Sequence, residues 1–132
     1  RQLMYSCMNS NLEISKLLIL NGAEINCYDM QKDTPLFYAC GCDNRTNLNI
    51  DLIKFLISKN AKFNIISEEG FSVLHYASGC TSKSPNFEVL KYLINIKVDT
   101  DLVDIENNLF VEYLFKHASI YKVLNFPFLL LF

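Results

Sequence analysis

The chain has 132 residues, the length of one domain, and its 51% hydrophobic and 20% charged residues make it too apolar for a disordered segment. Twelve basic and fourteen acidic side chains give a net charge of −2 without a lysine or arginine cluster, which disfavours nucleic acid as a partner. The longest apolar run, at residues 126–132, is far shorter than the roughly 20 residues that span a bilayer, so we expect no membrane segment.

Five cysteines, an odd number spread along the chain, favour a reducing compartment. No secretion signal is visible at the N-terminus, although a longer parent chain leaves that question open. We therefore expect an intracellular protein located in the cytoplasm.

A repeated phrase divides the chain into units. Residues 33–42 (DTPLFYACGC) and 71–80 (FSVLHYASGC) are near copies, and a weaker copy opens the sequence. The units start at residues 1, 34 and 72, so they are 33 and 38 residues apart. This period is typical of a solenoid, in which each unit buries its apolar face by stacking on its neighbours.

Each unit is predicted to form two short helices. The first covers the opening phrase, in which a leucine is followed three residues later by a small residue that allows a neighbouring helix close approach. These pairs are Leu3 and Ser6, Leu36 and Ala39, and Leu74 and Ala77. The second helix is predicted to begin at Asn11, Asn49 and Asn86, because an asparagine side chain accepts hydrogen bonds from the free N–H groups of a first turn.

The second helices carry an apolar stripe at helical spacing, which we expect to face the core. Its members are Leu12, Ile14, Leu17 and Leu18, then Ile50, Leu52, Phe55 and Leu56, then Phe87, Val89, Tyr92 and Leu93. The helices should end at Gly22, Asn60 and Lys97; glycine and asparagine suit the left-handed conformation of such an end, whereas lysine suits it poorly.

The phrases DTPLFYA, FSVLHYA and NGAEIN resemble the T-P-L-H-x-A and G-A-D-x-N signatures of ankyrin repeats, over residues 1 to about 108. The resemblance implies an all-α solenoid of helix-turn-helix units with short hairpin-like finger loops. One domain would then contain a partial repeat (1–33), two repeats (34–71 and 72–108) and a degenerate or capping repeat (109–132). The missing first finger suggests that the chain begins inside a repeat.

The richness in Asn, Ile, Lys and Tyr and the YACGCDN insert are similar to ankyrin proteins of poxviruses. That resemblance implies a monomer in the host cytoplasm that binds a host protein. Many such proteins pass the bound target to a host ubiquitin ligase through an F-box-like segment, which is not recognisable after residue 108.

Several side chains were weighed for chemistry. Cys40, Cys42, Cys80 and His75 do not have the spacing of a zinc site, so no metal or other cofactor is expected. His75 occupies the histidine position of the repeat signature, and the resemblance implies that its imidazole holds the loop backbone. The acidic residues of 99–106 lack the glycine and the closing glutamate of a calcium loop, so a solvated finger is the preferred interpretation.

Partners of ankyrin stacks usually meet the finger tips and the concave helix face. The resemblance therefore assigns partner binding to Met30, Gln31, Lys32 and Asp33 in the first finger, to Glu68, Glu69, Gly70 and Phe71 in the second, and to Ile105, Glu106 and Asn107 in the third. Phe71 is the preferred contact, with packing on a neighbouring finger as an equal alternative. A tyrosine ladder (Tyr5, Tyr38, Tyr76 and Tyr113) is interpreted as packing between repeats, with concave-face anchors as the alternative.

The sequence thus predicts a non-enzymatic protein-binding module without a small-molecule substrate. A truncated relic without function and an enzyme are the alternatives, and the enzyme is disfavoured because no acid/base pair, nucleophile or phosphate loop is evident. Whether the inserts at 41–49 and 79–86 are contact loops, and whether 126–132 forms a cap, stays open.

Overall fold

The computed structural model describes residues 1–44, 47–118 and 125. In these residues the chain forms only helices and loops, which confirms the all-α prediction. The helices are α1 (Gln2–Met8), α2 (Leu12–Leu20), α3 (Pro35–Ala39), the 3-10 turn η1 (Cys42–Asn44), α4 (Ile50–Ser58), α5 (Val73–Ala77), α6 (Phe87–Asn95) and α7 (Phe110–His117). None of them is long and apolar enough to cross a membrane.

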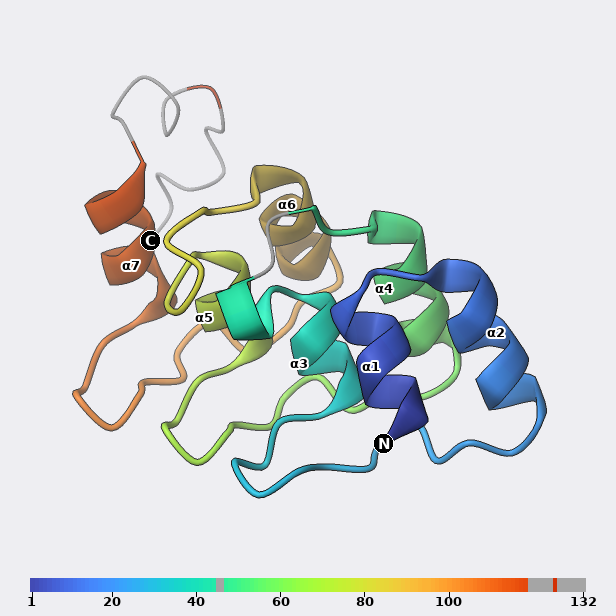
Figure 1. Cartoon of the computed structure of the whole chain (residues 1–132). Helices are drawn as coiled ribbons and strands as arrows, with labels where there is room; N and C mark the ends of the chain where they lie inside the picture. Colours follow the sequence, from blue (N-terminus) through green and yellow to red (C-terminus); the bar gives the residue numbers. More distant parts are fainter. Residues whose placement is uncertain (45–46, 119–124, 126–132) are drawn as a thin grey trace.

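The helices are arranged as a stack of pairs (Figure 1). Helix α1 packs on α2 and on α3, α3 packs on α4 and α5, and α5 packs on α6 and α7. The three long loops that join successive pairs all project from the same side of the stack (Figure 1). We call these loops the first finger (residues 24–34), the second finger (62–72) and the third finger (99–109).

The asparagine caps predicted for the second helices are present. The side chains of Asn11, Asn49 and Asn86 each accept a hydrogen bond from a first-turn N–H group of α2, α4 and α6. In the same way, the side chains of Thr34 and Ser72 cap the five-residue helices α3 and α5. Side-chain caps of this kind fix where each helix begins, which matters most for helices of one or two turns.

The three second helices also end at the predicted residues. Gly22, Asn60 and Lys97 have φ angles of 92°, 71° and 65°. Lys97 therefore adopts the left-handed conformation despite its Cβ atom, and the third unit leaves its helix in the same way as the first two.

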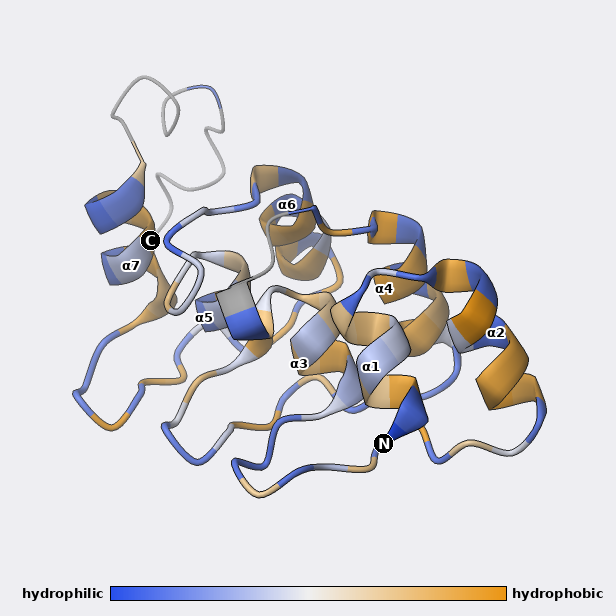
Figure 2. Ribbon diagram, viewed as in Figure 1, coloured by the Kyte–Doolittle hydropathy of each residue, from blue (hydrophilic) through white to orange (hydrophobic). Residues whose placement is uncertain are grey.

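One hydrophobic cluster runs through the stack from Leu3 to Leu114. Leu36 and Leu74 are fully buried in it, together with the small residues Ala39 and Ala77, as predicted from their spacing. Apolar residues are prominent on α2 and α4 in Figure 2, and on α2 several of them lie on the surface.

The predicted stripe of α2 is wrong in part. Ile14 is 49% exposed and Leu17 is exposed as well, whereas Leu52 and Val89, at the position of Ile14, are buried. The stripe also omitted the fully buried Ile53 and Leu90; their counterpart in α2 is Ser15, whose hydroxyl lies 2.8 Å from that of Ser6.

A ladder of lysines and aromatic rings joins the second helices. The Nζ atom of Lys16 lies 5.6 Å from the ring centroid of Phe55, and that of Lys54 lies 5.5 Å from the ring centroid of Tyr92. Both lysines thus contact the next unit through cation–π geometry, which adds roughly 0.5–1 kcal/mol at an exposed site.

The insert at 79–86 is compact, since the Asn86 N–H donates to the carbonyl of Ala77 and the Lys83 N–H to that of Gly79. The 41–49 insert is described only on either side of residues 45–46. The tail at 126–132, for which a role as a cap was left open above, lies outside the described residues.

Candidate functional site: the finger row

The three fingers end in the same tight turn. Backbone hydrogen bonds close it from Asp29 N to Asp33 O (3.1 Å), from Ser67 N to Phe71 O (2.9 Å) and from Asp104 N to Asn108 O (3.1 Å). The residue before the closing one has a positive φ angle in all three turns, at Lys32, Gly70 and Asn107. The repeat therefore specifies the shape of its tips as well as that of its helices.

Neighbouring tips are hydrogen-bonded to each other. The Glu68 N–H donates to the carbonyl of Gln31 (2.8 Å), and the Ile105 N–H donates to that of Glu69 (3.0 Å). The second and third fingers approach so closely that a Cβ atom added to Gly70 would lie 2.8 Å from the Cα atom of Asp104. The tips thus form a preorganised row, which lowers the ordering cost of binding.

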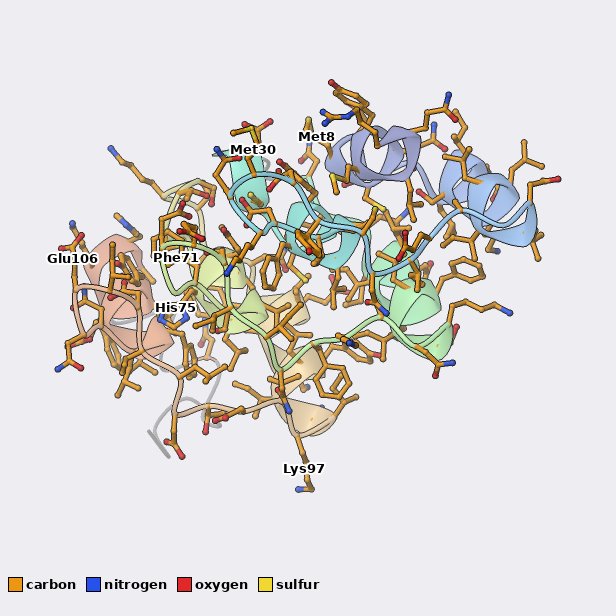
Figure 3. The ribbon with its side chains drawn as sticks, turned by 90° about the horizontal axis from the view of Figure 1, so that it is seen from below. Met8, Met30, Phe71, His75, Lys97 and Glu106 are labelled. Carbon is orange, nitrogen blue, oxygen red and sulfur yellow. The ribbon has the colours of Figure 1, made fainter. Side chains whose placement is uncertain are left out.

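Most of the tip residues assigned to partner binding lie on the surface. Met30 is 91% exposed and Ile105, at the same repeat position, is 75% exposed. Gln31, Lys32, Glu68, Glu106 and Asn107 are exposed as well. Lys32 and Glu68 form an ion pair of 3.9 Å between exposed side chains. Figure 3 shows Met30 and Glu106 near the rim of the molecule.

Phe71 and Asp33, in contrast, point into the structure, and Glu69 is half-buried. The ring of Phe71 lies 5.9 Å from that of His75, 5.5 Å from that of Tyr76 and 6.1 Å from that of Tyr113. Phe71 therefore packs on side chains of α5 and α7, whereas the alternative given above was packing on a neighbouring finger. Asp33 is only 5% exposed, so a partner meeting the tips does not reach it.

The tyrosine ladder anchors the fingers to the helices. The hydroxyl of Tyr38 donates to Asp29, and that of Tyr113 donates to Asp104, each within one finger and the helix that follows. The second finger has Ser67 in place of the aspartate. Tyr76 donates instead to Asp33 of the first finger, at 2.5 Å.

These two kinds of pairing give the carboxylates different acidities. Burial raises the pKa of Asp33 to about 6, an effect that the hydrogen bond from Tyr76 only partly offsets. Burial also acts to raise the pKa of Asp104, but hydrogen bonds from Tyr113 and from the N–H groups of Asn108 and Glu106 outweigh it and lower the pKa. Burial therefore disfavours the ionised form of Asp33, and part of this carboxyl is protonated near pH 6 in the folded chain.

His75 has both ring nitrogens engaged. Its Nδ1 accepts from the Ser72 N–H (3.2 Å), and its Nε2 lies 2.8 Å from the carbonyl of Asn108 in the third finger. The imidazole therefore ties down the loop backbone, as the resemblance implied. Burial lowers the pKa of His75 and favours this neutral form.

Four of the five cysteines have thiols that burial makes less acidic. Burial raises the pKa of Cys40, Cys42 and Cys80, and that of Cys7 to about 11, so these thiols stay protonated at neutral pH. No group of three His, Cys, Asp or Glu side chains among the described residues is arranged to hold a metal ion.

Sequence reasoning missed an apolar row on the fingers. Tyr28, Ile66 and Val103 occupy one repeat position and are all exposed. The signal in the sequence is their recurrence at the same position of three successive repeats.

Comparison with known proteins gives one family. The model of the family described as ankyrin repeats (three copies) matches residues 3–104 of the chain. A search of curated proteins found no match to the sequence.

Proposed function

Because the chain belongs to the ankyrin-repeat family, whose repeats indicate a protein–protein interaction module, we propose that it recognises a protein partner through the tips of its three fingers. The partner-binding residues are Met30, Gln31, Lys32, Glu68, Ile105 and Glu106. The concave helix face, which partners of ankyrin stacks also meet, extends this surface.

The observation that carries the proposal is the pair of exposed apolar side chains at equivalent tips. Met30 and Ile105 are among the most exposed large hydrophobic residues of the chain. They stand on either side of Glu68 in a row held by backbone hydrogen bonds. Apolar side chains on a rigid support, with charged neighbours, have the composition of a binding hot spot with a polar rim.

The finer part of the proposal is that the partner is a host protein and that the chain, as a monomer, selects it for a viral host-range factor or a ubiquitin-ligase adaptor. This part is supported by the resemblance of the amino-acid composition and of the YACGCDN insert to poxvirus ankyrin proteins. All five cysteines are unpaired, which suits the proposed location in the cytoplasm.

Binding without catalysis is favoured by the state of the titratable groups. The imidazole of His75 is occupied on both nitrogens, and burial raises the pKa of the Cys7 thiol to about 11. An activated nucleophile needs the opposite arrangement, a free base beside a thiol of lowered pKa.

The test is quantitative capture from host-cell cytosol with mass spectrometry, comparing the wild-type chain with the double variant Met30→Ser, Ile105→Ser. A specific partner should be retained by the wild type and lost by at least tenfold in the double variant. Leu20→Ser is the matched control, because Leu20 is equally apolar and exposed but lies at the end of α2. A partner lost equally with the control, or with neither variant, would contradict binding at the tips.

A further inference from the structure

The fingers present a second surface besides their tips. Asp29 lies against α3, where it pairs with Tyr38, whereas its neighbour Tyr28 lies on the surface and lines a hollow together with Ile66. Tyr28 is 69% exposed and Ile66, at the same position of the second finger, is 46% exposed. We call the face that carries Tyr28, Ile66 and Val103 the underside; Figure 3 views the molecule from the finger side.

The underside contains a hollow between the first and second fingers. It has a volume of about 340 Å³ and is lined by Tyr28, Ile65 and Ile66, with Lys32 and Lys62 as its charged residues. The lining residues include no carboxylate.

The walls of this hollow are fixed by Asn26. Its side chain donates to the carbonyl of Asn60 (3.2 Å) and accepts from the N–H of Lys62 (2.8 Å). The first finger is thereby tied to the start of the second, and the hollow exists before a ligand binds.

Charge changes sign along the underside. Lys62 borders the hollow, whereas Asp99 and Asp101, at the repeat positions of Lys62 and Asn64, make the third finger acidic. Lys32 forms an ion pair with Glu68, but both side chains are exposed, so the pair contributes little to stability. The charge of Lys32 therefore stays available to a ligand. In a chain of net charge −2, the hollow is a local basic site beside an apolar row.

We propose that the underside binds an extended peptide segment of a protein partner, with an acidic residue over the hollow and an apolar side chain against Tyr28 and Ile66. In a polyproline II conformation, side chains three residues apart share a face about 9 Å apart. This spacing is similar to the distance between the axes of packed helices, about 8–10 Å. A second apolar residue three positions along therefore reaches Val103, where the acidic third finger disfavours another carboxylate.

The inference rests on the proposed role in protein recognition, but it uses a surface that shares only Lys32 with the tips. The probe is a phage library of random dodecapeptides selected on the whole chain, followed by anisotropy titration of the enriched peptides. We expect them to carry Asp or Glu beside a large apolar residue. Binding should weaken at least tenfold with Tyr28→Ser and with Lys62→Glu, and a peptide whose acidic residue is replaced by lysine should recover binding to the Lys62→Glu variant.

Two controls separate this site from the others. Lys91→Glu makes the same charge change on the exposed face of α6 and should leave the affinity unchanged, as should the tip variant Met30→Ser, Ile105→Ser. Binding that is lost in the tip variant alone would overturn the underside site while supporting the tips. The underside site would also be overturned if no peptides were enriched, or if neither underside variant changed the affinity of the enriched peptides. The capture from cytosol tests binding at the tips independently.

Discussion

At the scale of single residues, Asp33 shows how a change in one repeat is compensated in another. Tyr38 and Tyr113 find an aspartate in the finger directly before their helix, but Ser67 leaves Tyr76 without one. Asp33 of the first finger accepts the hydrogen bond from Tyr76 instead, and its carboxylate is buried in this position. Aligning the repeats reveals the missing aspartate but not its replacement, because that contact joins residues 43 positions apart.

This burial predicts a pH-dependent stability. The pKa of Asp33 is raised from 3.8 to about 6, so its ionised form destabilises the folded chain above pH 6, by about 3 kcal/mol for two pKa units. This cost disappears as the pH falls from 6 toward 4. Asp33→Asn should therefore stabilise the chain by about 1–3 kcal/mol at pH 7.5, and its advantage should shrink below pH 6. Urea unfolding across this range measures it.

The comparison has to be made as a difference between the two proteins, because His75 acts in the opposite direction. The folded pKa of His75 is lowered, so its contribution to stability is lost as the pH falls below 6.5. His75 is present in both proteins and cancels. An advantage of Asp33→Asn that does not change between pH 7.5 and 4.5 would show that Asp33 is not the titrating group.

Gly70 carries the second prediction at this scale. Its φ of 81° is unfavourable for any residue with a Cβ atom, and that atom would meet the Asp104 backbone at 2.8 Å. Gly70→Ala should cost about 2–4 kcal/mol of unfolding free energy, the left-handed penalty plus displacement of the third finger. Gly22→Ala, with a φ of 92° but nothing within 4 Å, should cost only about 1–2 kcal/mol. Equal losses in urea unfolding would refute close contact between the fingers.

At the scale of elements, the end of α6 at Lys97 is a place where a substitution should raise the stability of the chain. Lys97 ends α6 with a φ of 65° where the first unit has Gly22. Lys97→Gly should stabilise the chain by about 1 kcal/mol, because glycine enters the left-handed region without a steric penalty. Lys91→Gly, in the middle of the same helix, should cost about 1 kcal/mol instead. Thermal unfolding followed by circular dichroism distinguishes the two, and a loss with both would show that Lys97 is not a helix end.

The helices illustrate what the sequence can and cannot predict. Their starts and ends follow from local chemistry, because Asn49 caps its own helix and Gly22 ends its own. Which apolar residues are buried depends on the neighbouring units: Ile14 and Leu52 have equivalent positions, but Ile14 is half exposed in the first unit, whereas Leu52 is buried in the second unit, which has a unit packed on either side. The packing of Phe71 is likewise set by other elements, since its aromatic neighbours come from α5 and α7.

At the scale of the whole molecule, the stack has a single core but unequal units. Helices α4 and α6 contribute three and four buried residues, whereas α2 contributes only Ser15. In a linear array each unit is stabilised mainly by its neighbours, so a unit with a thin interface opens first. A relic without function would lack protection throughout, whereas a working module needs a protected centre that holds the fingers.

Amide hydrogen exchange measured by mass spectrometry tests this gradient. Peptides from α2 should exchange through local opening, at a free energy well below that of global unfolding, while peptides from α4 and α6 should approach the global value. Low urea should leave exchange in α2 almost unchanged and accelerate exchange in α4, because only global opening exposes much surface. Equal protection in α2 and α4 would mean that the stack opens as one unit despite the serine at its first interface. Rapid exchange in all three helices would instead favour the relic.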